Sequence, residues 1–452
     1  MKKGMFFALA ASSLLFSACS SDDAVVSTVG QNEAVQQIVL QVASSGDGLT
    51  TRAGRPLYSS EALQTIQNVR VVIYNADTKE IVKDATQDWT KSTTYNNHGH
   101  GRQFTLTFKG NDRLEKGNYK VMAVGYSNES DYDYSLGATS AVGLTYSDIT
   151  ATLKAGKKEA EEVFAGDADL KIGDDKKITN LTSGEENGVA VTLHRQVAGS
   201  FGYFQNIPAS VNGKAAATLR LVVRDKNDVL TFNKFNSSFT ANGATGSTIK
   251  YYVNGSRSTG EALATTDKFS NGDNGYVLYS IDLKTWFPQL DENGDGVLNA
   301  QDASWKRPDN VKTQVVKGSV FGSNFVIPFK YTEGKSTMEL QLLDADGNII
   351  KHWTVSIPES DLNKVAANGV TDADASIFNV VRNHMYNLGV KTSTGTTTTP
   401  DPSNPTPDPK PDPKPTPDPG KDEPEDLTKS QNLILKVNDN WEVIHKMELG
   451  DE

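Results

Sequence analysis

Cysteine is almost absent from this chain, in which Cys19 is the only one among 452 residues. A single thiol cannot form an internal disulfide, so no disulfide framework supports the fold. Long apolar runs are also scarce, because after residues 5–16 no stretch approaches the ~20 apolar residues that span a bilayer. The stability of the mature protein must therefore come from core burial, and its attachment to a membrane from lipid.

Basic clusters are absent as well, and the formal net charge is −11. This balance argues against nucleic acid as a partner and against charge-driven binding to anionic headgroups. The sequence also lacks a Gly-x-Ser-x-Gly elbow, a phosphate loop and a zinc-hydrolase helix. We expect no catalytic residues and a protein that is not an enzyme, although paired carboxylates of a secreted hydrolase stay open as the weakest alternative.

The N-terminus has the pattern of a lipoprotein signal. Lys2 and Lys3 precede the apolar run 5–16, and Ser17 and Ala18 stand directly before Cys19. This predicts a signal peptide over 1–18 and a lipidated leader over 19–52, with diacylglycerol and palmitate on Cys19. The protein is then expected on the outer membrane, facing the cell surface. An ordinary secretory signal with an incidental cysteine is the alternative.

The body of the chain favours an all-β fold. Short alternating or β-branched runs recur between turn signals, and helical periodicity is scarce. Its length predicts two tandem β-sandwich domains, over 53–195 and 196–391. The expected strands are 69–74, 103–109, 119–126, 189–195, 197–204, 218–224, 276–283, 324–331, 337–343, 349–357 and 385–391.

The leader contains a strand of its own. Ile38 and Leu40 alternate with Val39 and Gln41 within 35–42, and a Gly-, Ser- and Thr-rich loop follows up to Arg52 and Ala53. Such a loop is accessible to proteases. A trypsin-like enzyme that cuts between Arg52 and Ala53 would make the leader strand separable and would open a groove in the body.

The C-terminal end combines a linker and an isolated strand. Residues 392–428 are rich in Thr and Pro and predict an extended linker, whose part 399–424 could span roughly 80 Å. The tail 429–452 then carries 433–437 and an alternating strand over 441–449. An isolated strand is marginal in water, so we interpret the tail as a donor to another molecule's sheet. The alternative is that it folds back onto its own second domain. The side chains on the apolar face of the donor are Trp441, Val443, Met447 and Leu449.

Several segments together resemble one family, the Bacteroidales fimbrillins or type V pilins. They are FSAC at 16–19, TRA at 51–53, IQNVRV at 66–71, EEVFAG at 161–166, RQVAG at 195–199, YFQNIP at 203–208 and VRNHMY at 381–386. The resemblance implies two transthyretin-like β-sandwiches and an arginine-specific protease that acts at Arg52. It also implies that a neighbouring subunit's C-terminal strand fills the groove, so that other fimbrial subunits are the partners.

Residues 291–302 match the twelve-residue calcium loop. Oxygen ligands are expected from Asp291, Asn293, Asp295, the Val297 carbonyl, Asn299 and Asp302, with Gly296 at the sharp turn. The alternative is a solvated acidic turn.

Two functions from different classes follow. The first is a structural subunit of a cell-surface fimbrium that polymerises by protease-triggered donor-strand exchange and supports adhesion. The second is a monomeric surface lipoprotein that binds glycans or acts as an adhesin. The tail favours the first, because a monomeric binding protein needs no apolar strand beyond a linker.

Overall fold

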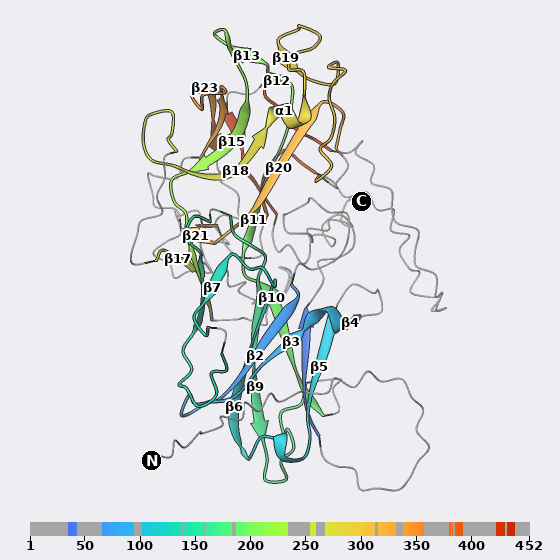
Figure 1. Cartoon of the computed structure of the whole chain (residues 1–452), viewed down its shortest axis with the longest axis vertical. Helices are drawn as coiled ribbons and strands as arrows, with labels where there is room; N and C mark the ends of the chain where they lie inside the picture. Colours follow the sequence, from blue (N-terminus) through green and yellow to red (C-terminus); the bar gives the residue numbers. More distant parts are fainter. Residues whose placement is uncertain are drawn as a thin grey trace, which may run out of the picture.

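A computed structural model of the chain gives an almost entirely β fold (Figure 1). It describes residues 35–42, 66–94, 102–137, 139–157, 159–182, 187–233, 254–258, 267–311, 315–330, 338–356, 379–380, 382, 385–391, 422–429 and 432–438. Within these ranges no helix is long and apolar enough to cross a membrane. The all-β class predicted from the sequence is confirmed.

The first sandwich lies in the lower part of Figure 1 and is one eight-stranded sheet that folds over on itself. Strand β10 connects its two halves, because 188–193 pair with β1 whereas His194 and Arg195 pair with β9. Both halves direct apolar side chains inward, among them those of β2 and β10. In sheet order the strands are β3 (Ile81–Asp88), β2 (Asn68–Asn75), β6 (Gly117–Tyr126), β9 (Phe164–Ile172), β10 (Gly188–Arg195), β1 (Gln36–Val42), β5 (Arg102–Phe108) and β4 (Thr93–Thr94), and the short 3-10 helices η1 (Trp89–Lys91) and η2 (Gly110–Asp112) follow β3 and β5.

The second sandwich, in the upper part of Figure 1, pairs two five-stranded sheets. One sheet contains β20 (Ser319–Val326), β11 (Ala198–Gln205), β25 (Met385–Leu388) and β28 (Lys436–Asn438), with β26 (Glu425–Asp426) also on β11. The other contains β18 (Tyr276–Asp282), β15 (Thr218–Val223), β22 (Met338–Leu343), β23 (Ile349–Ser356) and β27 (Asn432–Ile434), and helix α1 (Leu283–Trp286) follows β18.

Two neighbouring glycines let these sheets approach closely. Gly202 of β11 is opposite Gly322 of β20. A Cβ at Gly202 would collide with the Tyr279 hydroxyl, and a Cβ at Gly322 would collide with Ile281. Both partners belong to β18 in the facing sheet, so glycine at these positions sets the spacing between the sheets.

A four-stranded sheet joins the two sandwiches. It orders β17 (Gly255–Ser256), β16 (Val229–Phe232), β8 (Ile149–Leu153) and β7 (Tyr132–Tyr134). Its strands β7 and β8 precede residue 195 and the other two follow it, so this sheet crosses the predicted domain boundary. Three two-stranded pairs complete the described strands: β12 (Ile207–Pro208) with β19 (Val297–Leu298), β13 (Ser210–Val211) with β14 (Lys214–Ala215), and β21 (Phe329–Lys330) with β24 (Asn379–Val380).

A buried polar cluster lies where β10 leads into β11. The Arg195 guanidinium is 2.8 Å from the Glu162 carboxylate, and the exposed fractions of the two side chains are only 2% and 0%. Arg382 donates to Gln196 Oε1 over 3.0 Å, and Asn254 donates to the same oxygen over 3.2 Å. Three segments that carry the family resemblance therefore meet here, and their polar residues have a structural role at the junction.

The junction yields a stability prediction. Glu162→Gln should leave the buried Arg195 charge without its counter-ion and lower the free energy of unfolding by about 3–5 kcal/mol. Asp174→Asn is the control, because the Lys116–Asp174 pair is largely exposed (66% and 85%) and should contribute little. Urea titration measures both, and equal midpoints for the two variants would contradict a structural role for the buried pair.

Candidate functional site

The leader strand β1 lies inside the sheet and not at its edge. It pairs in parallel with β10, where Leu40 is opposite Val191, and antiparallel with β5, where Leu40 is opposite Phe104. Seven residues of β1 take part in the antiparallel pairing. Removing β1 would therefore separate two strands that its backbone now connects, and would leave both with unpaired N–H and C=O groups.

The side chains of β1 are buried on the core face of the sheet and partly buried on the other face. Ile38 and Leu40 are 0% exposed and belong to the core of the first sandwich, and Val39 on the opposite face is 3% exposed. Gln36 is also buried, and its side-chain amide donates to the carbonyls of Leu114 (3.0 Å) and Lys176 (2.8 Å). Burial of the three apolar side chains contributes about 5–9 kcal/mol, which is comparable to the whole net stability of a typical domain.

The covalent link between β1 and the rest of the sandwich is the segment that contains the predicted cleavage site. In chain order, β1 ends at Val42 and β2 begins at Asn68. Arg52 and Ala53 lie between them, outside the described residues, as does Cys19. A cut after Arg52 would leave β1 held by hydrogen bonds and apolar contacts alone.

A substitution in β1 tests how much this strand contributes to the stability of the fold. Leu40→Ala should lower the free energy of unfolding of the precursor by about 2–5 kcal/mol, because Leu40 is fully buried between two strands. The neighbouring Gln41→Ala is the control and should have a much smaller effect, since Gln41 is only partly buried. Similar melting temperatures for the two variants would show that β1 contributes little.

The tail differs from the expectation of a strand with no sheet beside it. β27 pairs in parallel with β23, and β28 pairs antiparallel with β25. Leu433 and Leu435 are 1% and 0% exposed. For residues 432–438 the alternative holds, because this part of the tail completes its own second sandwich. The donor residues Trp441, Val443, Met447 and Leu449 lie outside the described residues.

The predicted calcium loop folds into a compact turn that contains β19, and β19 pairs with β12. Asp291 accepts from the Gly296 N–H over 3.0 Å, and Asp291 and Gly296 both have positive φ angles. Asp302, which is 0% exposed, accepts from the N–H groups of Glu292 (2.9 Å) and Asn299 (2.8 Å). These bonds give the loop its turns and close its ends.

The remaining ligand candidates gather around one carboxylate. The side-chain amides of Asn293 and Asn299 donate to Asp295 Oδ2 over 3.0 and 2.8 Å. The bond from Asn299 is the largest cause of the lowered pKa of Asp295. In the described part of the chain no group of three or more His, Cys, Asp or Glu side chains is placed to hold a metal. Calcium binding stays a prediction, in which the cation would replace the two amide donors at Asp295.

Calcium should raise the melting temperature of the protein if the loop binds it, because a ligand of the folded state stabilises by about 2.7 kcal/mol at a hundredfold excess over Kd. Asp291→Ala with Asp295→Ala should abolish that rise. Asp346→Ala, in another Asp-x-Asp-Gly turn, is the control and should retain it. A wild-type melting temperature that is the same in calcium and in chelator would identify the loop as a turn only.

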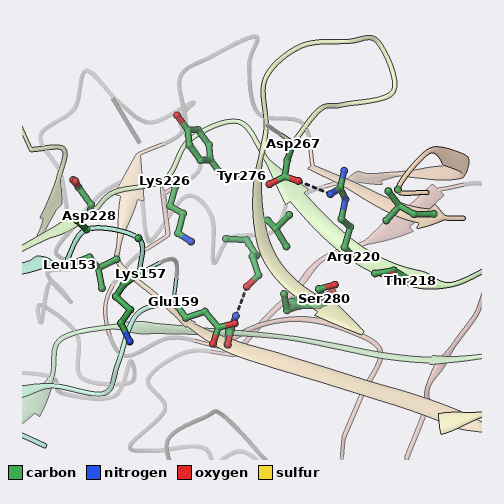
Figure 2. A pocket seen from close by; sticks show the side chains of 18 of the residues that line it. Leu153, Lys157, Glu159, Thr218, Arg220, Lys226, Asp228, Asp267, Tyr276 and Ser280 are labelled. Carbon is green, nitrogen blue, oxygen red and sulfur yellow. Dashed lines mark hydrogen bonds and ion pairs between the residues drawn. The ribbon is translucent and has the colours of Figure 1, made fainter. Parts of the chain in front are cut away.

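A cavity of about 820 Å³ lies between residues 152–157 with Glu159 and strands β15 and β18 (Figure 2). Its charged residues are largely paired with one another or with neighbours. Arg220 is 2.7 Å from Asp267, and Asp228 accepts from the Ser258 hydroxyl over 2.5 Å. Tyr276 lines the cavity, and its ring lies 5.1 Å from the Arg257 guanidinium carbon. Sequence patterns gave no signal for this site, because its lining comes from segments far apart in the chain.

No protein-family model and no curated protein matches the chain. Among solved structures it is similar to a fimbrial assembly protein from Parabacteroides distasonis, at 14% identity and a TM-score of 0.32, covering 80% of this chain and 93% of that one. The fimbrial anchor protein Mfa2 from Porphyromonas gingivalis matches at 10% identity and a TM-score of 0.32, covering 78% and 90%. A proposed adhesin from Bacteroides ovatus matches at 10% identity and a TM-score of 0.35, covering 79% and 90%. These are similarities in the outline of the fold only.

Proposed function

We propose that this chain is a structural subunit of a cell-surface fimbrium and that it polymerises by donor-strand exchange. The single observation that carries the proposal is the interior position of β1 between β10 and β5. A strand at the edge of a sheet could leave without opening the core. A central strand whose core-facing side chains are fully buried leaves a groove that only another strand can fill.

The order of the segments along the chain supports the same function. The strand that leaves belongs to the leader, which also carries Cys19, so one cut after Arg52 would release the body from lipid and open the groove together. An arginine-specific protease and other fimbrial subunits are the proposed partners, and the outer membrane holds the precursor through lipid. The proposed donor is the strand 441–449 of a second subunit.

Binding of a surface glycan is the second candidate, and the cavity beside strands β15 and β18 favours it. Tyr276 offers an aromatic face, and Arg220, Asp267 and Asp228 offer hydrogen-bonding groups within about 820 Å³. Cavities of this size with a few polar groups are usual for small ligands. A glycan array tests this role, and a Tyr276→Ala variant that binds as the wild type does would exclude the cavity.

Controlled proteolysis tests strand exchange. Treated with a trypsin-like protease, the purified precursor should lose its leader and form a ladder of polymers on a denaturing gel. Arg52→Ala should stay monomeric. Val443→Asp should be cut normally but form no ladder, because it would bury a charge in the groove. Lys446→Asp is the control, since its side chain alternates to the other face of the donor strand, and it should polymerise.

Two results would reject the proposal. One is a ladder formed by Arg52→Ala protein without cleavage. The other is a wild-type protein that is cut completely after Arg52 and remains monomeric at high concentration.

A further inference from the structure

The Pro-rich segment begins and ends at one point of the second sandwich. The Lys391 ammonium, directly before it, lies 2.8 Å from the Asp422 carboxylate, directly after it, and the exposed fractions of the two side chains are 2% and 0%. Val390 and Glu423 exchange both backbone hydrogen bonds, at 2.8 and 2.9 Å. The residues on either side of 392–421 are therefore held next to each other on the body.

The chain after this point is fixed to the body by several independent contacts. Asp422 also accepts from the Tyr203 hydroxyl over 3.0 Å, and β26 pairs with β11. Asn206 donates to Asp426 over 2.8 Å, and Leu427 is 0% exposed. Then β27 extends one sheet of the sandwich and β28 extends the other. We call residues 422–438 the root of the tail.

The direction of β28 shows where the root ends. β25 runs parallel to β11 and begins beside Gly199, where Met385 pairs with it. β28 runs antiparallel to β25, so Asn438 pairs with Met385. The tail thus leaves the second sandwich at the end where β11 follows β10, which is the junction with the first sandwich.

The root also ends on the side of the molecule that holds the leader strand. Ala160, upstream of β9, bridges to Phe325 of β20, so β9 and β20 lie on one side of the consecutive strands β10 and β11. The sheet orders β9-β10-β1 and β20-β11-β25 then put β1 and β25 on the other side. The donor therefore starts near the junction end of its own groove.

Chain length limits what the donor can reach from there. Trp441 lies at most about 10 Å from Asn438, because the two residues are three positions apart in the chain. The groove ends beside Leu193, six residues before Gly199 along nearly continuous strands, which is about 20 Å at ~3.3 Å per residue. In its own molecule, the first half of the donor would be used to cross the junction, and only its end could enter the groove.

We propose that the Pro-rich segment 392–421 is a side loop that adds nothing to the donor's reach, and that the fixed root makes the tail too short to fill its own groove. The complete donor strand then fits only the groove of a second copy of this chain, and that groove must lie next to the junction from which the tail of the first copy extends. The second part of this inference rests on the proposed function, whereas the first part does not.

A cut within segment 392–421 tests whether the root is bound to the body, and the test does not depend on polymerisation. A site for a specific protease, inserted after Asn404 in the precursor, should yield a C-terminal fragment that co-elutes with the body in native buffer and separates in urea. Lys391→Met should speed dissociation at least about tenfold, because Asp422 would lose its buried partner. Lys429→Met is the control, since its side chain is 79% exposed. A wild-type fragment that elutes separately in native buffer would overturn the root.

Two length variants test the reach. Replacing 392–421 by Gly-Ser-Gly should leave the polymerisation rate of the cleaved protein within about twofold of the wild type. Inserting about eight Gly and Ser residues between Asn438 and Asp439 should instead let the donor fill its own groove, giving capped monomers. If the loop deletion stops assembly, or the insertion leaves the ladder unchanged, this inference is wrong. If the unmodified cleaved protein forms no polymer, the proposed function is wrong and the root test still stands.

Discussion

The pairing of β1 between β10 and β5 is the interaction on which the rest of the structure depends. It closes the eight-stranded sheet of the first sandwich with a strand that comes from the leader of the precursor. Ile38, Val39 and Leu40 are buried on both faces of that sheet. Loss of such a strand would leave both neighbouring strands with unpaired backbone groups, and the proposal is that another subunit's strand fills that gap.

The tail is held by a different set of forces. Its root is fixed by a buried ion pair between Lys391 and Asp422, short strand pairings and three buried leucines. In the proposed assembly the two ends of the chain have complementary roles. One cut would separate the leader strand, whereas the proposed donor 441–449 would extend from the fixed root. A few residues of chain length would then decide whether the proposed donor fills the groove of its own molecule or that of a neighbour.

The sequence predicted much of this fold, and its errors have physical causes. The alternation in 35–42 predicted β1, and strands such as 69–74 and 349–357 were placed within a few residues. Strands β3, β8, β9 and β16 were not predicted. In β3 the half-buried polar residues of IVKDATQD hide the periodicity. β8 and β16 do alternate, but over only five and four residues. The linker predicted over 392–428 was wrong at its C-terminal end, because Asp422 and β26 belong to the second sandwich. No local sequence pattern shows that Lys391 and Asp422 form an ion pair. The shared sheet and the cavity also depend on contacts between distant segments.

Hydrogen–deuterium exchange of the strands beside the groove tests the central claim most directly. The amides of 188–193 and 103–108 pair with β1 or lie beside it in the precursor, so they should exchange slowly. They should exchange quickly in cleaved monomer stripped of its leader, and slowly again in the polymer, while those of β22 stay protected throughout. Slow exchange of 188–193 in the stripped monomer would mean that the groove does not open, and would contradict the account.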